Sequence, residues 1–361
     1  MDNFERAFKM PTSFDVKDVI FYNVRKEPFS IYGLFEPTKQ APFRRLPENV
    51  AKMTNDGVTT LALDTAGGRV RFSTDSPYVI IKLSLPNVNR FAHMPLTGTT
   101  GVDVYEDTDG GSKFVKAARP EINITDGYEI IVKFDRPKMR SLTVNFPSFN
   151  HVDDMFIGIS ETARLRSGRK YANKKPIVFY GSSITQGACS SRPGTTCQNF
   201  ISRRYNLDYI NLGFSGSARA EAAIVSYMAK LPMLAFVSDY DHNAPNVEHL
   251  NDTHSRLYDT IREENPDIPY IMLSRPNFNG TASDNARRDV VINTYRRARE
   301  LGDKNVYYID GEGLFSGPFS DDCTVDGTHP NDLGFSLIAD RLGRVIDRAL
   351  RDTEFGGNND D

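Results

Sequence analysis

The sequence predicts two domains of different class: an all-β sandwich of the jelly-roll type over residues 1–165, and an α/β domain with a parallel sheet over residues 176–354. Two observations lead to this prediction. Apolar and polar residues alternate with a period of two from about residue 15 to residue 165, whereas short apolar runs alternate with helical patterns after residue 176. Between them, the basic stretch RLRSGRKYANKK contains few large aliphatic residues, which predicts a linker over residues 166–175.

The first half is expected to contain many short strands joined by polar turns, the pattern of two facing sheets. No long amphipathic helix interrupts these strands. The turn Asp109-Gly110-Gly111 is typical of a hairpin tip. The clearest strand segments are VRFSTDSPYVIIKLSL, TGVDVYEDTDGGSKFVKAA, YEIIVKFD and RSLTVNFPSF.

The second half is expected to form a five-stranded parallel sheet with helices on both faces, because its strands and helices alternate. In the last helix, the spacing places Leu333, Leu337, Ile338, Val345 and Ile346 on one apolar face. The tail over residues 355–361 is expected to be disordered. Strands are predicted at 177–180, 209–214, 234–239, 270–274 and 306–310, and helices at 197–206, 219–230, 247–264, 283–300 and 331–350.

Composition excludes several classes of function. The net charge is −3, and Lys and Arg are scattered and balanced by Asp and Glu, which argues against a nucleic-acid partner. No run of about eighteen apolar residues exists, so no membrane span is expected. The N-terminus lacks a basic segment followed by an apolar one, which predicts a cytoplasmic protein and leaves open a mature exported form.

The cysteines and histidines predict neither a disulfide framework nor a metal site. Small buried or loop thiols are favoured for Cys189, Cys197 and Cys323, and a Cys189–Cys197 pair is the alternative in an oxidising compartment. His249 and His254 are five residues apart, not the four that would share a helix face. We therefore predict no metal and no cofactor.

Residues suited to acyl transfer follow the first and last strands of the predicted sheet. Gly-Ser-Ser-Ile-Thr follows the first strand and contains Ser183, and Asp-Gly-Thr-His after the fifth contains Asp326 and His329. Ligands bind outside the carboxyl ends of parallel strands, so these segments are expected to meet. A serine needs a base to become a nucleophile, and a carboxylate must orient the histidine that serves as that base. We predict Ser183 as nucleophile, His329 as base and Asp326 as its partner.

Two further strand exits supply candidate donors for the oxyanion of a tetrahedral intermediate. Gly216 in NLGFSGSAR can offer an unobstructed backbone N–H, Asn243 in SDYDHNAPN can offer a side-chain amide, and Ser183 can offer its own N–H. Candidate substrate-binding residues are Arg192, His242 and Arg275. Surface ion pairs for the two arginines, and a capping or loop role for the histidine, are the alternatives.

These blocks resemble the SGNH (GDSL-type) hydrolase superfamily. The first block appears as Gly181-Ser182-Ser183-Ile184-Thr185, with Ser182 in place of the usual Asp, and the Asp-x-x-His block as residues 326–329. Gly216 and Asn243 match the second-block glycine and third-block asparagine, although the usual Gly-x-Asn-Asp form of the third block is absent. Residues 101–105, Gly-Val-Asp-Val-Tyr, are similar to the Gly-x-Asp-Leu-Tyr signature of a sandwich domain that precedes such esterases. The resemblance implies a flavodoxin-like three-layer α/β/α hydrolase domain.

The residues themselves predict a serine esterase that acts through an acyl-enzyme. The small, polar strand exits favour a short acyl group such as acetyl, and the resemblance implies a carbohydrate ester. The substrate is thus expected to be a small-molecule or oligosaccharide ester; no oligomeric state is predicted. One alternative is a lipase, phospholipase or thioesterase acting on longer acyl chains. The other is a carbohydrate-binding protein whose hydrolase domain is inactive, since jelly-roll sandwiches also serve as lectin-like modules.

Overall fold

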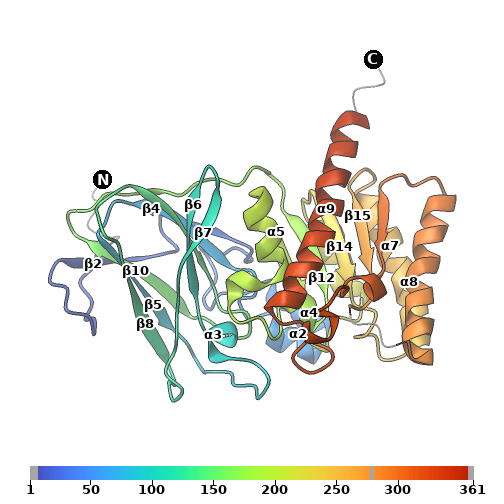
Figure 1. Cartoon of the computed structure of the whole chain (residues 1–361), viewed down its shortest axis with the longest axis horizontal. Helices are drawn as coiled ribbons and strands as arrows, with labels where there is room; N and C mark the ends of the chain where they lie inside the picture. Colours follow the sequence, from blue (N-terminus) through green and yellow to red (C-terminus); the bar gives the residue numbers. More distant parts are fainter. Residues whose placement is uncertain (1–6, 277–279, 357–361) are drawn as a thin grey trace. The chain divides into compact units, whose positions relative to one another are not determined.

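The computed structural model describes residues 7–276 and 280–356, and these divide into two compact units (Figure 1). Unit 1 contains residues up to Arg45, Leu63–Ala172 and the short segment Ser191–Gly194. Unit 2 contains Leu46–Ala62, Asn173–Ser190 and the chain from Thr195 onward. Each unit has its own hydrophobic core, as an independent domain requires.

Unit 1 is built from two antiparallel sheets, as the period-two pattern predicts. In the first sheet the strand order is β1-β2-β10-β5-β8, and in the second it is β11-β4-β9-β6-β7, with β3 also paired to β4. The strands are β1 (Ala7–Phe8), β2 (Val19–Asn23), β3 (Ser30–Tyr32), β4 (Arg69–Thr74), β5 (Tyr78–Ser84), β6 (Asp103–Thr108), β7 (Gly111–Ala117), β8 (Gly127–Lys133), β9 (Arg140–Asn145), β10 (Asp154–Ser160) and β11 (Leu165–Ser167). The short helix α3 (Leu96–Thr99) lies between β5 and β6.

The two sheets of unit 1 share one apolar core. Phe72 of β4 and Val144 of β9 belong to the same buried cluster as Ile81 of β5 and Ile157 of β10, and all four are fully buried. Alternate residues of strands from both sheets therefore meet between them, which is the arrangement of a β-sandwich. The predicted all-β domain class is confirmed.

Unit 2 contains a five-stranded parallel sheet with the order β13-β12-β14-β15-β16. In order along the chain this is 2-1-3-4-5, the flavodoxin-like order, whose switch point lies between β12 and β14. The strands are β12 (Ile177–Gly181), β13 (Tyr209–Gly213), β14 (Ala235–Asp239), β15 (Tyr270–Leu273) and β16 (Val306–Ile309), each within one residue of the prediction at either end.

Helices cover both faces of this sheet, so alternate residues of β12 join different cores. Val178 and Tyr180 pack toward α6 (Ala222–Ala229), α7 (Val247–Glu264) and α8 (Ala282–Glu300), whereas Ile177 and Phe179 pack toward α5 (Cys197–Tyr205) and α9 (Asp332–Gly356). Figure 1 shows α5 and α9 running in front of the strands. The three-layer α/β/α class is confirmed. None of the helices in the described part of the chain is long and apolar enough to cross a membrane.

Two segments do not follow the predicted domain ranges. The helices α1 (Glu48–Thr54) and α2 (Asp56–Leu61) lie in the predicted sandwich range but belong to unit 2. Asn55 accepts a hydrogen bond from the Val58 N–H and donates to the Ser217 carbonyl at 3.0 Å, which ties these helices to the turn after β13. The predicted linker also differs, because β11 and the chain up to Ala172 belong to unit 1.

One predicted core position of the last helix is wrong. Leu333 is 40% exposed, whereas the buried face of α9 is formed by Phe335, Ile338, Leu342 and Ile346. Leu333 lies in the first turn of the helix, two residues before Phe335, the first buried apolar residue of α9. Helix α9 includes residues 355 and 356 of the predicted disordered tail, and residues 357–361 lie outside the described residues.

Candidate active site

The turn after β12 presents Ser183 at the start of a short helix. Ser182 is the N-cap of α4 (Ser183–Gln186), and its hydroxyl accepts a hydrogen bond from the Ile184 N–H at 3.1 Å. The helix ends at Gln186, and its C-cap is Gly187, whose φ of 105° lies in the left-handed region that favours glycine. The serine-rich strand exit is therefore a capped, one-turn helix that fixes the position of the Ser183 hydroxyl.

Asp239, at the end of β14, holds this turn against the neighbouring strand. Its Oδ1 accepts from the Ser182 N–H at 3.1 Å, and its Oδ2 accepts from the Thr185 hydroxyl at 2.8 Å. A Cβ at Gly181 would lie only 2.5 Å from the Asp239 carbonyl oxygen, so only glycine fits there. Burial raises the pKa of Asp239 to about 6, although both hydrogen-bonded neighbours act to lower it. The sequence pattern alone assigned no role to Asp239.

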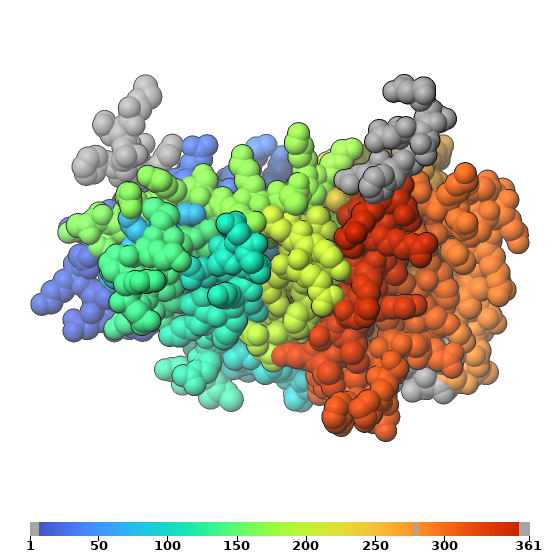
Figure 2. Space-filling view, turned by 45° about the horizontal axis from the view of Figure 1, so that its top comes forward, coloured from blue at the N-terminus to red at the C-terminus, as the bar shows by residue number. Residues whose placement is uncertain are grey.

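The loop between β16 and α9 carries Asp326 and His329, and Figure 2 shows this orange-red segment on the surface of unit 2. Asp326 Oδ1 accepts from the His329 N–H at 2.8 Å and from the Thr328 N–H at 3.0 Å. Gly327 has a φ of 80°, a left-handed conformation that turns the chain between the two side chains. These contacts allow a carboxylate and an imidazole three residues apart to face each other.

Ser183, His329 and Asp326 form a continuous hydrogen-bonded chain. The distance from Ser183 Oγ to His329 Nε2 is 2.9 Å, and that from His329 Nδ1 to Asp326 Oδ2 is 2.7 Å. Because an ionised carboxylate only accepts, Nδ1 carries the proton and Nε2 is left to accept from the serine. Burial acts to raise the pKa of Asp326, but the hydrogen bonds from His329 and Thr328 outweigh it and lower the pKa to about 2. The carboxylate is thus charged throughout the neutral range.

The candidate oxyanion donors lie on two turns that contact each other. The Asn243 side-chain amide donates to the Phe214 carbonyl at 3.0 Å, which leaves its second hydrogen for another acceptor. Gly216 follows on the same turn with a φ of 67°, and a Cβ there would meet no atom within 4 Å. The structure thus brings the turn of Gly216 and the loop of Asn243 together, and Phe214 is itself bonded through its N–H to the Gly181 carbonyl.

Two of the three candidate substrate-binding residues, His242 and Arg275, lie near the same carboxylate, Asp284. His242 lies between two carboxylates, with Nε2 at 2.8 Å from Asp284 and Nδ1 at 3.2 Å from Asp241. Arg275 lies 3.6 Å from the same Asp284, and its guanidinium donates to the Thr328 hydroxyl at 3.1 Å. Asp284 was missed at the sequence level, although Thr281-x-x-Asp284 is a capping-box pattern that marks the start of α8.

The third candidate, Arg192, lies in the segment that belongs to unit 1. Its Nε is 3.4 Å from Asp103, and its guanidinium lies over the Phe114 ring at 4.4 Å. Asp103 also accepts from the Gly194 N–H at 2.8 Å and from the Asn145 amide at 2.7 Å. The aspartate of the Gly-x-Asp-Leu-Tyr-like signature therefore holds the Ser191–Gly194 segment in unit 1.

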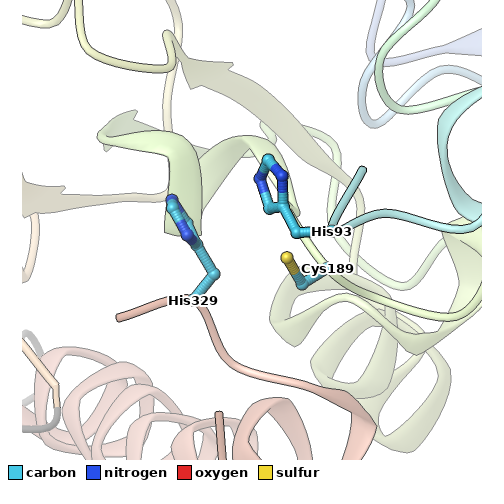
Figure 3. Close-up of side chains that lie close together, drawn as sticks. All are labelled: His93, Cys189 and His329. Carbon is cyan, nitrogen blue, oxygen red and sulfur yellow. The ribbon is translucent and has the colours of Figure 1, made fainter. Parts of the chain in front are cut away.

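All three cysteines are buried and none of them is in a disulfide bond, as the low count favoured. Cys189 lies near the triad: its thiol and a ring nitrogen of His329, two of the side chains drawn in Figure 3, are within 4.8 Å of each other. Burial raises the pKa of Cys189 to about 12, and nearby Asp326 adds to the effect. A metal ion held by this pair would need a thiolate and a free imidazole nitrogen, whereas both nitrogens of His329 are engaged by Ser183 and Asp326.

Known proteins resemble both halves of the chain. Residues 174–347 match the GDSL-like lipase/acylhydrolase family, and residues 19–165 match the family named GxDLY, the N-terminus of SGNH-hydro-type esterases. A search of curated proteins finds no match.

Solved structures share the fold over nearly the whole chain. A protein from Bacteroides ovatus described as a GDSL-like lipase has a TM-score of 0.82 at 25% identity, covering 92% of this chain and 98% of that one. A salicylyl-acyltransferase from a tetracycline biosynthetic pathway has a TM-score of 0.75 at 18% identity, with coverages of 92% and 98%. An acetyl xylan esterase from the rumen bacterium Butyrivibrio proteoclasticus has a TM-score of 0.58 at 13% identity, with coverages of 93% and 99%.

The two family matches follow each other along the chain in the order that the sequence pattern predicts, and the parallel sheet and the β-sandwich are the folds expected of them. Residues 174–347 thus form a domain of the GDSL-like lipase/acylhydrolase family, and residues 19–165 form a GxDLY domain of the kind found at the N-terminus of SGNH-hydro-type esterases.

Proposed function

We propose that this chain is a serine esterase that removes short acyl groups, acetyl in particular, from carbohydrate, with Ser183, His329 and Asp326 as its catalytic triad. The observation that carries the proposal is the pair of consecutive hydrogen bonds, 2.9 Å and 2.7 Å, that joins the serine hydroxyl through the imidazole to the carboxylate. This is the geometry that lets a neutral histidine remove a proton from a serine.

In the proposed acylation step, Ser183 Oγ attacks the ester carbonyl carbon while its proton moves to His329 Nε2. Asp326 stabilises the imidazolium that forms, since its low pKa keeps it ionised. The C–O bond to the leaving alcohol then breaks, and His329 returns the proton to that oxygen. The products of the step are a free sugar hydroxyl and an acyl-Ser183 ester.

In deacylation, water attacks the acyl-serine and gives its proton to His329, which passes it to Ser183 Oγ as the carboxylic acid leaves. Both steps place negative charge on the carbonyl oxygen, which needs preorganised donors. We assign the backbone N–H groups of Ser183 and Gly216 and the side-chain amide of Asn243 to this task. The Asn243–Phe214 hydrogen bond supports the assignment, because it holds the amide on the turn that carries Gly216.

The choice of a short acyl group rests on the residues around the nucleophile. The turns that follow β12 and β13 are rich in small and polar residues, among them Ser182, Ser183, Ser215, Gly216 and Ser217, and such residues favour a short acyl chain. The carbohydrate part is supported by structural relatives such as the acetyl xylan esterase, which share the fold at low identity. Reaction class therefore rests on this chain's own residues, and substrate class rests on likeness.

The test is acetate release from acetylated xylan, acetylated oligosaccharides and a chromogenic acetate ester. Ser183→Ala and His329→Ala are each expected to reduce turnover to near background. The matched control is Ser226→Ala, which removes an exposed serine hydroxyl of α6 outside the nucleophile turn and should leave turnover unchanged. Full activity in a folded Ser183→Ala protein would overturn the assignment of the nucleophile.

A series of chromogenic esters from acetate to octanoate separates the proposal from its closest rival. The rate is expected to fall as the chain lengthens, because the residues near Ser183 are small and polar. A rate that rises toward octanoate would instead identify a lipase-like or thioesterase-like enzyme with the same triad. No hydrolysis of any ester by folded protein, with glycan binding by unit 1, would favour the carbohydrate-binding alternative.

A further inference from the structure

Arg275 connects the two loops on which the proposed chemistry depends. It follows β15, and its guanidinium Nη2 donates to the Thr328 hydroxyl at 3.1 Å. Thr328 stands between Asp326 and His329, and its own N–H donates to Asp326 at 3.0 Å. The backbone N–H of Arg275 donates in the other direction, to Asp241 Oδ2 at 3.0 Å. One residue therefore contacts both the acid–base loop and the loop that carries Asn243.

Carboxylates on two elements hold the guanidinium and its neighbour His242 in place. Asp284, in the first turn of α8, lies 2.8 Å from His242 Nε2 and 3.6 Å from Arg275 Nη1. Its second oxygen accepts from the Thr281 hydroxyl at 2.7 Å, so the carboxylate is fixed to the helix start. Burial acts to lower the pKa of His242, but Asp241 and Asp284 outweigh it and raise that pKa.

We propose that Arg275 is a positioning residue which, together with His242 and Asp284, fixes the 326–329 loop relative to the loop that carries Asn243. In this role it touches neither substrate nor the reacting atoms. It sets the distance between the base, His329, and the Asn243 amide, so that both reach one carbonyl group at once. The inference rests on the proposed function, because it assigns a role toward that same site.

The chemistry of the guanidinium suits this task. A planar cation with several N–H donors can engage a hydroxyl and a carboxylate at the same time, whereas an ammonium presents a single point of charge. The Arg275 side chain is 16% exposed and that of Asp284 is 6% exposed, so their attraction is poorly screened by solvent. The Thr328 contact is the sensitive one, because it lies one residue from His329, and a misplacement of about 1 Å can cost roughly a hundredfold in rate.

The same contacts distinguish this role from the substrate-binding role that the sequence predicts for Arg275. If Arg275 bound substrate, its substitution would change KM, and removal of the Thr328 hydroxyl would have no such effect. A positioning residue would influence kcat and would act through that hydroxyl. The decisive variants are therefore Thr328→Val, which removes the acceptor and keeps the shape, and Thr328→Ser, which keeps the acceptor.

The experiment is a double-mutant cycle on the full chain with Arg275→Ala, Thr328→Val and the double variant. Kinetics are measured with the chromogenic acetate ester, and Ser183 labelling by an organophosphonate is measured as a second readout. Both single variants are expected to lower kcat by roughly tenfold to a hundredfold with KM within about twofold. The double variant should be little worse than either single one, because both remove the same contact. Thr328→Ser should restore kcat to near the wild-type value.

The matched control is Arg297→Gln, which removes an arginine of α8 that pairs with Asp259 of α7 at 2.5 Å, away from both loops. It should leave kcat unchanged. A wild-type kcat in Thr328→Val would overturn the proposal, and so would a raised KM with unchanged kcat in Arg275→Ala. If Arg275→Ala does not fold, the comparison of kcat between Thr328→Val and Thr328→Ser still tests the proposal. Failure of the proposed function is distinct, since it appears as activity that survives Ser183→Ala.

Discussion

The tight fit of Gly181 against β14 gives the sharpest structural prediction. A Cβ at this position would lie 2.5 Å from the Asp239 carbonyl oxygen, 2.6 Å from Thr185 Oγ1 and 2.8 Å from Asp239 Oδ1. Two of these atoms belong to the residue that holds the nucleophile turn, and one of them is backbone, so the turn must move to admit a methyl group. Gly181→Ala is therefore expected to affect both stability and the position of Ser183.

The magnitude follows from the overlap. Forcing one extra carbon into a packed interior typically costs about 1–3 kcal/mol. A domain of the size of unit 2 loses about 2–4 °C per kcal/mol, so Tm should fall by about 2–12 °C. A shift of Ser183 by about 1 Å away from His329 should also lower kcat by roughly a hundredfold. The loss of kcat should therefore exceed what the change in folded fraction explains.

The assay is differential scanning calorimetry together with kcat on a chromogenic acetate ester, at a temperature where both proteins are folded. Gly313→Ala is the matched control, because it makes the same substitution at a glycine where a Cβ meets no atom within 4 Å. That control should keep both the wild-type Tm and the wild-type kcat. Equal behaviour of the Gly181 and Gly313 variants would refute the argument that the close approach of β14 positions the nucleophile.

Three further outcomes are expected. Asn243→Ala should lower kcat by roughly a hundredfold to a thousandfold with KM little changed, as measured by steady-state kinetics; an unchanged kcat would remove Asn243 from the oxyanion site. Asp326→Asn should lower kcat by roughly 10⁴-fold. The pKa of Asp326 is lowered from 3.8 to about 2, so the ionised carboxylate stabilises the folded protein above pH 3.8, and this stabilisation is lost as the pH falls toward 2. In thermal unfolding, the Tm difference between wild type and Asp326→Asn should therefore shrink over that pH range. His242 has a pKa raised above 6.5, so its stabilisation is present below pH 6.5 and is lost as the pH rises through the raised value; His242→Gln should lower Tm more near about pH 5 than near about pH 9, and a constant difference would contradict the charge pairing with Asp284.

Local pattern was sufficient to predict the strands of the parallel sheet and to nominate Ser183, His329 and Asp326 as the triad. The alternation of apolar strands with amphipathic helices predicts each element of the parallel sheet, because burial on both faces demands continuous apolar strands. The motifs at residues 181–185 and 326–329 predict that Ser183, His329 and Asp326 meet, because the carboxyl ends of parallel strands lie at one edge of the sheet. The structure joins the three side chains by two consecutive hydrogen bonds. These inferences need only residue types, spacing and chain order.

Contacts between residues far apart in sequence were decided by the tertiary structure. The range 46–62 carries helices that belong to unit 2, and Ser191–Gly194 belongs to unit 1, and the sequence pattern predicted neither assignment. Leu333 satisfies the apolar period of its helix and is still exposed, because periodicity defines a face but not how far the partner layer extends.

The same distinction applies to the polar residues. The sequence alone determined that this chain is a β-sandwich followed by a doubly wound hydrolase domain with a serine, a histidine and an aspartate at its strand ends. Only the tertiary structure decided that Arg275 contacts Thr328 and that Asp239 holds the nucleophile turn. Charge and hydrogen-bonding capacity are properties of a residue, but its partner depends on long-range packing that no local pattern encodes.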